Sequence, residues 1–128
     1  MKSLKKLTTL LVVDEIEACL PTWQALGYSL TVRVPESGTM GFAILKGPSS
    51  GAAELMLQTR ESLREDLPSV ASKKPSFLLY ADVDSLASAR GALKGAHVLV
   101  EERETFYGAT ESWLELSGGV ILGLSKHG

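Results

Sequence analysis

The sequence contains little of what marks several common protein classes. One cysteine in 128 residues, Cys19, excludes an internal disulfide framework and a cysteine-rich zinc module, and favours a reducing, cytoplasmic location. Thirteen Lys and Arg against fifteen Asp and Glu give a formal charge of -2, without the basic excess of a non-specific nucleic-acid binder. No apolar run approaches the roughly 18 residues that span a bilayer. We therefore expect neither a nucleic-acid partner nor a membrane partner.

Several catalytic signatures are also missing. No serine stands in a Gly-x-Ser-x-Gly turn, and the glycines at 47–51 and 118–119 lack the Lys-Ser/Thr pair of a phosphate-binding loop. His97 is expected on a surface or strand edge and His127 near a mobile end, with no carboxylates spaced around either as metal ligands would be. The sequence therefore gives no motif for nucleophilic, phosphate or metal chemistry.

The residues that are present predict one globular domain with a repeated order of elements. Hydrophobic residues make up 45% of the chain, enough for a core without metal or disulfides. Ile16, Leu20 and Trp23 follow Asp14 at helical spacing, and Gly27 is suited to end that helix. Around this helix, alternating or continuous apolar residues predict strands at 8–13, 28–34, 40–46 and 53–58.

The same order returns in the second half of the chain. A charged connector with two prolines, 59–75, has room for one helical turn and precedes a strand at 77–81. The segment Asp82-Val83-Asp84-Ser85 is expected to start a helix that carries Leu86, Ala89 and Leu93. Asp14 and Asp82 are 68 positions apart, and so are Gly27 and Gly95. Further strands are predicted at 98–101, 112–116 and 120–124. A unit repeated in this way usually packs against its copy.

Five segments together resemble a known superfamily. They are LLVVDEIEACLPTWQALGY (10–28), GFAIL (41–45), AELMLQ (53–58), LLYADVDSLASARGAL (78–93) and RETFYGATESWLELSGGVILG (103–123). In this order they resemble the vicinal oxygen chelate, or glyoxalase/bleomycin resistance/dioxygenase, superfamily. The resemblance implies an α+β fold in which two tandem βαβββ modules form a curved, partly open, barrel-like mixed sheet with helices on its convex face. It implies a single domain over 1–128, with module one at about 7–60, a connector at about 61–75 and module two at about 76–126.

The concave face of that fold forms a cup, which holds a metal ion in the enzymes. By resemblance, the four ligand positions fall on Leu7, Glu54, Leu78 and Leu122. A divalent ion needs at least three protein ligands of suitable type, so we expect neither a metal nor another cofactor. Slipping the alignment by one residue does not help, because Thr8, Leu79 and Ile121 are no better ligands.

Strand alternation applied to this resemblance supplies the candidate binding residues. The cup is expected to be lined by Leu7, Thr9, Leu11, Glu54, Met56, Gln58, Leu78, Tyr80, Val120, Leu122 and Leu124. Phe106, Tyr107 and Trp113 are expected near its rim, with Glu111 exposed beside them. Non-enzymatic members of the superfamily sequester planar antibiotics in a cup between two subunits. The resemblance thus favours a metal-free homodimer that binds an apolar or aromatic small molecule.

Other interpretations stay open. Trp23 is expected in the core, Cys19 as a buried structural thiol, and Met56 as a residue that fills a gap in packing. Glu54 would be purely structural if an arginine pairs with it or if water fills the cup. One alternative function is a metal-dependent lyase, isomerase or dioxygenase with ligands at other positions. Another is a structural or interaction module whose own side chains fill the cup.

Overall fold

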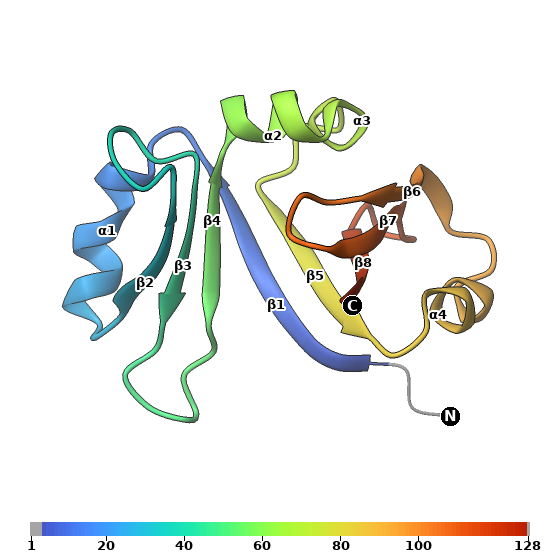
Figure 1. Ribbon diagram of the computed structural model, residues 1–128, viewed down its shortest axis with the longest axis horizontal. Coiled ribbons are helices and arrows are strands. Elements are labelled where there is room, and N and C mark those ends of the chain that lie inside the picture. Colours follow the sequence, from blue (N-terminus) through green and yellow to red (C-terminus); the bar gives the residue numbers. More distant parts are fainter. Residues whose placement is uncertain (1–3, 128) are drawn as a thin grey trace. The chain divides into compact units, whose positions relative to one another are not determined.

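The computed structural model describes residues 4–127, which form an α+β structure of eight strands and four helices (Figure 1). The strands are β1 (Leu4–Val13), β2 (Ser29–Val34), β3 (Phe42–Lys46), β4 (Leu55–Thr59), β5 (Phe77–Val83), β6 (His97–Glu104), β7 (Ala109–Glu115) and β8 (Ile121–His127). The helices are α1 (Ile16–Ala25), α2 (Arg60–Asp66), α3 (Pro68–Ala71) and α4 (Leu86–Ala92). This order confirms the predicted class and its two tandem βαβββ modules.

The described chain divides into two compact units. The first unit comprises residues 8–77, and the second unit comprises residues 4–7 together with 78–127. None of the helices within 4–127 is long and apolar enough to cross a bilayer.

In the first unit the strand order is β2-β3-β4-β1, with β1 parallel to β4 and the other neighbours antiparallel. Helix α1 covers one face of this sheet, where Ile16 is buried with Ala43, Leu45 and Leu57. Apolar residues at the spacing of a helix stripe therefore meet alternate residues of the strands, as the sequence pattern requires.

The predicted connector contains two short helices, which is more helix than the single turn expected there. Thr59 caps α2, since its hydroxyl accepts a hydrogen bond from the Ser62 backbone N–H at 3.1 Å. Leu63, Leu67 and Val70 are buried along α2 and α3. Their spacing is helical, but the charged residues between them and Pro68 concealed it in the sequence. Pro68 is tolerated because it stands at the first position of α3.

The second unit repeats the arrangement with the strand order β5-β8-β7-β6, in which β5 and β8 are parallel. Helix α4 covers one face through Leu86 and Ala89. Ala81, Leu114 and Leu124 contact it from the strands below.

The repeat has a different offset from the one the sequence suggested. Asp14 and Asp84 occupy the same bend between the first strand and the helix of their modules, 70 positions apart, whereas Asp82 lies inside β5. Gly27 and Gly95 remain 68 apart and both adopt a positive φ after their helices. The two offsets differ by two residues because α4 has 7 residues against 10 in α1, and the turn between α4 and its glycine is one residue longer. Thr8, not Leu7, is therefore the equivalent of Leu78.

Candidate functional site

The sheet of the second unit has one face covered by α4 and one face away from it, which we call the open face. Leu122 and Leu124 pack under α4, so the prediction that they line the cup is wrong. The strand register instead places Tyr80, Glu111, Trp113 and Ser125 on the open face, because they alternate with residues that pack on α4. Tyr80 on β5 thus lies on the face expected for it, whereas the alternation expected for β8 is displaced by one residue.

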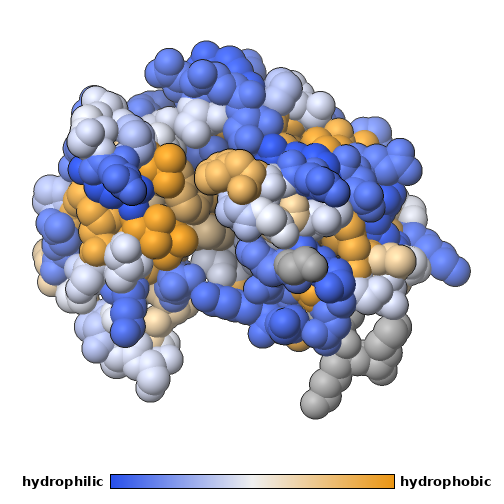
Figure 2. Space-filling view, viewed as in Figure 1, coloured by the Kyte–Doolittle hydropathy of each residue, from blue (hydrophilic) through white to orange (hydrophobic). Residues whose placement is uncertain are grey.

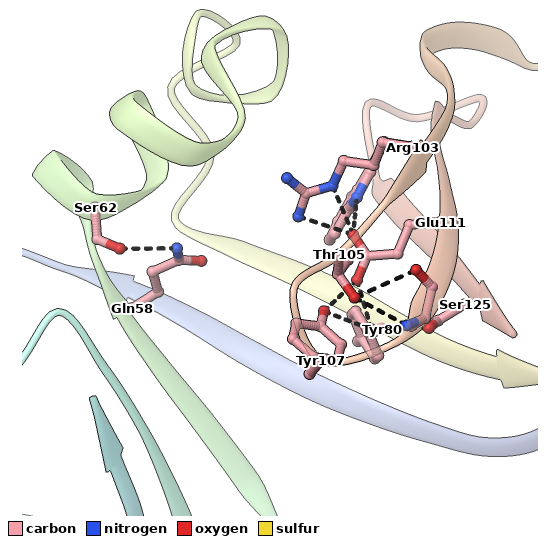
Figure 3. A network of polar contacts seen from close by, with 10 residues as sticks. Gln58, Ser62, Tyr80, Arg103, Thr105, Tyr107, Glu111 and Ser125 are labelled. Carbon is pink, nitrogen blue, oxygen red and sulfur yellow. Dashed lines mark hydrogen bonds and ion pairs between the residues drawn. The ribbon is translucent and has the colours of Figure 1, made fainter. Parts of the chain in front are cut away.

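The same displacement affects β1 in the first unit. Leu11, predicted to line the cup, packs toward α1, and Thr9 shares its face. Met56 and Gln58 lie on the face away from α1, as predicted, in register with Leu10 and Val12. Both are buried, and the Gln58 amide donates a hydrogen bond to Ser62 Oγ at 3.1 Å (Figure 3). Glu54 is half-buried just before β4.

A buried carboxylate, Glu111, is the centre of the open face of the second unit (Figure 3). Its side chain is 1% exposed, which corrects the expectation that it is exposed. Oε1 accepts hydrogen bonds from Trp113 Nε1 at 3.0 Å and from Arg103 Nε at 3.0 Å, and Arg103 Nη2 lies 2.9 Å away. Oε2 accepts hydrogen bonds from the hydroxyls of Tyr80 at 2.6 Å and Tyr107. The charge is therefore paired and both oxygens are satisfied.

Three strands and one hairpin loop bring these partners together. Arg103 on β6 lies directly across from Glu111 on β7, so the two side chains share a face. Tyr80 comes from β5 and Tyr107 from the loop between β6 and β7. Because Tyr80 gives its only hydroxyl proton to Glu111, the hydroxyl of Ser125, 2.9 Å away, is free to donate to the Tyr80 oxygen. Within residues 4–127, no buried side-chain nitrogen or oxygen lacks a hydrogen-bond partner.

Gly123 makes room for the largest member of the network. It lies opposite Trp113 in the β7–β8 register, and a Cβ at Gly123 would stand 2.5 Å from the indole ring. The indole is 2% exposed and lies 6.0 Å from the Tyr80 ring between centroids. We call Tyr80, Arg103, Tyr107, Glu111, Trp113 and Ser125 the Glu111 network.

Solved structures share this architecture at low sequence identity, whereas no family model and no curated protein sequence matches the chain. A protein from Staphylococcus aureus has a TM-score of 0.66 at 14% identity and is covered over 98% of both chains. Methylmalonyl-CoA epimerase from Mycobacterium tuberculosis has a TM-score of 0.66 at 18% identity, over 98% of this chain and 89% of its own. A glyoxalase/bleomycin resistance protein/dioxygenase superfamily member from Vibrio splendidus 12B01 has a TM-score of 0.65 at 12% identity, over 94% and 97%.

The chain has the glyoxalase/bleomycin resistance/dioxygenase fold. The resemblance predicted from sequence is thus confirmed at the level of the fold.

The corrected repeat also moves two of the four positions where the resemblance to this fold places metal ligands. Thr9 pairs with Leu55, so Thr8 lies beside Glu54. In the second module Leu79 pairs with Leu122, so Leu78 lies beside Ile121. Because Leu78 is the equivalent of Thr8, Ile121 is the equivalent of Glu54. With Thr8 in place of Leu7, the four positions are Thr8, Glu54, Leu78 and Ile121. One carboxylate and one hydroxyl do not make the donor set of a divalent ion. Nor do any three His, Cys, Asp or Glu within 4–127 form a group suited to one.

An aromatic surface adjoins the Glu111 network. We define it as Tyr80, Phe106, Tyr107 and His127. Phe106 is 92% exposed and packs edge-to-face on Tyr107, with centroids 5.2 Å apart. Tyr107 is 49% exposed, and its ring lies 6.1 Å from that of His127. His127 Nε2 is 3.3 Å from Asp82 Oδ1, so this histidine has a fixed partner, contrary to the expectation of a mobile end.

Sequence reasoning found Tyr80, Phe106, Tyr107, Glu111 and Trp113 as candidates, and the structure brings these five into one unit. It missed Arg103, Ser125 and His127. Arg103 shortly precedes the aromatic residues Phe106 and Tyr107 in the sequence, which could have made it a candidate. Its pairing with Glu111 depends on the register of β6 and β7, which the sequence does not specify. The binding roles of Glu54, Met56 and Gln58 stay predictions.

The two tyrosines of the Glu111 network are expected to resist ionisation. Burial, followed by the hydrogen bond to Glu111, raises the pKa of Tyr107 to about 12 and that of Tyr80 further still. Because the pKa of Tyr107 in the folded state exceeds the ordinary tyrosine value of about 10, the stability that this environment provides is complete below about pH 10 and is lost as the pH rises through about 12.

Absorbance at 295 nm in a Tyr28→Phe background, which removes the third tyrosine, measures this ionisation directly. We expect little phenolate at pH 10, and a rise near pH 12 that coincides with loss of near-ultraviolet circular dichroism. A full phenolate signal from the folded protein at pH 10 would show that the two hydroxyls are not held by Glu111.

Proposed function

We propose that this protein binds an apolar or aromatic small molecule on the aromatic surface and sequesters it without metal-dependent turnover. The observation that carries the proposal is that Phe106 is 92% exposed beside a tyrosine whose hydroxyl is fixed by a buried carboxylate. Leaving a phenylalanine in water forgoes about 1.5–3 kcal/mol of burial free energy. A ligand that covers Phe106 and Tyr107 recovers that free energy.

The Glu111 network would act as the support of the binding surface. Its hydrogen bonds fix the position of the Tyr107 ring before a ligand arrives, so less conformational entropy is lost on binding. The proton of Tyr107 is directed at Glu111, so the oxygen of this half-exposed tyrosine keeps a lone pair with which it can accept a hydrogen bond from a ligand. A planar ligand with a hydroxyl or N–H group suits such a surface better than a pure hydrocarbon.

The donor set supports sequestration over the alternative of a metal-dependent lyase, isomerase or dioxygenase. Those activities need an ion, and the four equivalent positions supply one carboxylate and one hydroxyl. The Glu111 carboxylate does not compensate, because Arg103, Trp113 and two tyrosines already occupy it.

We include a homodimer in the proposal. Leu4, Leu7, Val98 and Phe106 are apolar and 40% or more exposed in the second unit, and Val32 and Val34 in the first. Exposed apolar area of this kind is commonly covered by a second copy. Light scattering coupled to size-exclusion chromatography tests this part separately, and a monomer at 50 µM, about a thousandfold above a tight dissociation constant, would contradict it.

The binding proposal is tested with Trp113 as the reporter. In a Trp23→Phe background, Trp113 is the remaining tryptophan and lies against Tyr80. Titration with 1-naphthol, a planar aromatic with one hydroxyl, is expected to change its fluorescence saturably. Phe106→Ala removes the most exposed ring and should weaken binding about tenfold, the effect of losing one well-placed aromatic contact.

The matched control is Leu26→Ala, which removes an apolar side chain that is 62% exposed in the first unit. It should leave the affinity within about twofold. Equal affinity for 1-naphthol in Phe106→Ala and in the parent would contradict the assignment of the aromatic surface. A stoichiometric gain of Ni²⁺, Zn²⁺, Mn²⁺ or Fe²⁺ mass in a native mass spectrum, reversed by chelator, would instead favour the metal-dependent alternative.

A further inference from the structure

The first unit contains a hollow of about 500 Å³ that opens to solvent, and none of the aromatic-surface residues lines it. Its walls come from the start of α1, the β2–β3 loop and α2. Figure 2 shows hydrophobic surface over the part of the view that contains β2 and β3, next to the hydrophilic surface of α2. The apolar part is formed by Val34, Pro35, Met40 and Phe42. Such a volume lies within the range of about 300–1,000 Å³ that small-molecule sites occupy.

The loop that forms one wall is held from both ends. Arg33 Nε donates a hydrogen bond to the Pro35 carbonyl at 2.9 Å, and Nη2 donates another to the Gly38 carbonyl. On the other side, the Met40 backbone N–H donates to Glu17 Oε2 at 2.8 Å, which lowers the pKa of that carboxyl. The hollow is therefore shaped by hydrogen bonds within the chain, and a ligand would not have to order the loop.

Carboxylates surround the apolar part. Asp14, Glu15, Glu61 and Glu65 all line the hollow. Arg60 neutralises Asp14, with Nε 2.9 Å from Oδ1. Among the ion pairs within residues 4–127, none involves the other three, which are all exposed. The rim thus keeps three negative charges that nothing in the described chain neutralises.

Stabilisation of helix ends does not account for all three charges. Glu61 lies in the first turn of α2, where a carboxylate is favourable. Glu65 lies in the last turn of the same helix, where the macrodipole makes a carboxylate unfavourable. The helix therefore does not stabilise the Glu65 carboxylate, which lies at the rim of the hollow.

We propose that this hollow is a second binding site, which takes a small organic cation with an apolar body. Val34, Met40 and Phe42 would contact the apolar part, and the Phe42 ring also attracts a positive charge placed over its face. Glu15, Glu61 and Glu65 would lie around an ammonium group at the rim. An anion of the same shape is repelled by the same three carboxylates. The occupant is thus chosen by charge complementarity.

Three probes that share one ring system separate charge from shape. They are (1-naphthyl)methylammonium, the neutral alcohol 1-naphthalenemethanol and the anion 1-naphthoate. Binding is followed on the full chain by amide chemical shifts in ¹⁵N-labelled protein. We expect the ammonium to shift the amides of Thr39, Met40 and Gly41 saturably, the alcohol to bind about five- to tenfold more weakly, and naphthoate to leave them unchanged.

The double variant Glu61→Gln/Glu65→Gln keeps both side-chain shapes and removes two charges. It should weaken the ammonium about five- to tenfold and bring it close to the neutral alcohol. Its matched control is Glu102→Gln/Glu104→Gln, which removes two exposed carboxylates from β6 in the second unit. That control should bind the ammonium as the parent does, and raising the salt concentration should weaken binding in the parent more than in the double variant.

Equal affinity of the ammonium for the parent and Glu61→Gln/Glu65→Gln would overturn the proposal, and so would equal affinity for the ammonium and naphthoate. Amide shifts confined to residues 105–109 would place the cation on the aromatic surface and would also overturn it. The proposed function does not depend on this result, because Phe106→Ala and 1-naphthol test a different unit. The predicted site on the open face of the second unit can therefore fail while this one holds.

Discussion

Replacing Glu111 by alanine is expected to destabilise the protein by about 3–5 kcal/mol. The variant removes the carboxylate that pairs with the Arg103 guanidinium, and leaves the Trp113 N–H and two tyrosine hydroxyls without the acceptor that they share. The site is 1% exposed, so bulk water does not replace the carboxylate. In a chain of this size, such a loss lowers the melting temperature by about 10 °C or more. Urea unfolding followed by circular dichroism gives the free energy directly.

The conservative variant separates charge from volume. Glu111→Gln keeps the side-chain size and one acceptor oxygen, but its amide N–H₂ group meets donors on one side, so we expect a loss of about 1–3 kcal/mol. The control Glu102→Gln removes an exposed carboxylate from the neighbouring strand and should change stability by less than about 0.5 kcal/mol. If Glu111→Ala unfolded at the same urea concentration as the parent, the network would not stabilise the fold.

The fold was accessible from the sequence because local signals repeat along it. Ile16, Leu20 and Trp23 have helical spacing, and the glycines at 27 and 95 follow both helices with positive φ. Local signals also explain the errors. The match between Asp82 and Asp14 is wrong, because β5 continues through Asp82 to Val83. Matching Gly27 with Gly95 does not reveal that α4 is three residues shorter than α1.

Part of the predicted site is displaced because the positions on β1 and β8 were each aligned one residue out of register with β5. Side chains alternate with a period of two, so a shift of one residue moves Leu11 and Leu122 from the predicted cup to the helix-covered faces. Tyr80, which was expected in the cup, lies on the face away from α4 together with Glu111 and Trp113, so the alternation expected for β5 needs no such shift.

The Glu111 network itself could not have been predicted from the sequence. The residues of the network come from β5, β6, β7, β8 and a hairpin loop, so the contacts among them depend on strand order and register. A glutamate next to aromatic residues was expected to be exposed because burial of a lone carboxylate is unfavourable. The counter-charge on Arg103, eight residues earlier, changes that balance once β6 and β7 pair.

Gly123→Ala is expected to destabilise the protein by about 2–4 kcal/mol, although it adds one methyl group. The new Cβ would lie 2.5–2.6 Å from three carbon atoms of the Trp113 indole, so the ring must move. Trp113 is 2% exposed and donates its N–H to Glu111, and a displaced ring loses both its packing and that hydrogen bond. Unfolding in urea measures the loss, and in a Trp23→Phe background the emission of Trp113 should shift to the red.

A second substitution tests whether the clash with Trp113 is the cause. Trp113→Phe removes the outer ring atoms that the new methyl group meets, so the double variant Trp113→Phe/Gly123→Ala should be more stable than the sum of the single effects by about 1–2 kcal/mol. The matched control is Gly91→Ala on α4, where an added Cβ meets nothing within 4 Å and better helix propensity should stabilise the protein by about 0.5–1 kcal/mol. Strict additivity of the two substitutions would mean that Gly123 is required for the strand backbone and not for the Trp113 ring. Coupling between them would show that this glycine fixes the indole that supports Glu111, and through Glu111 the aromatic surface.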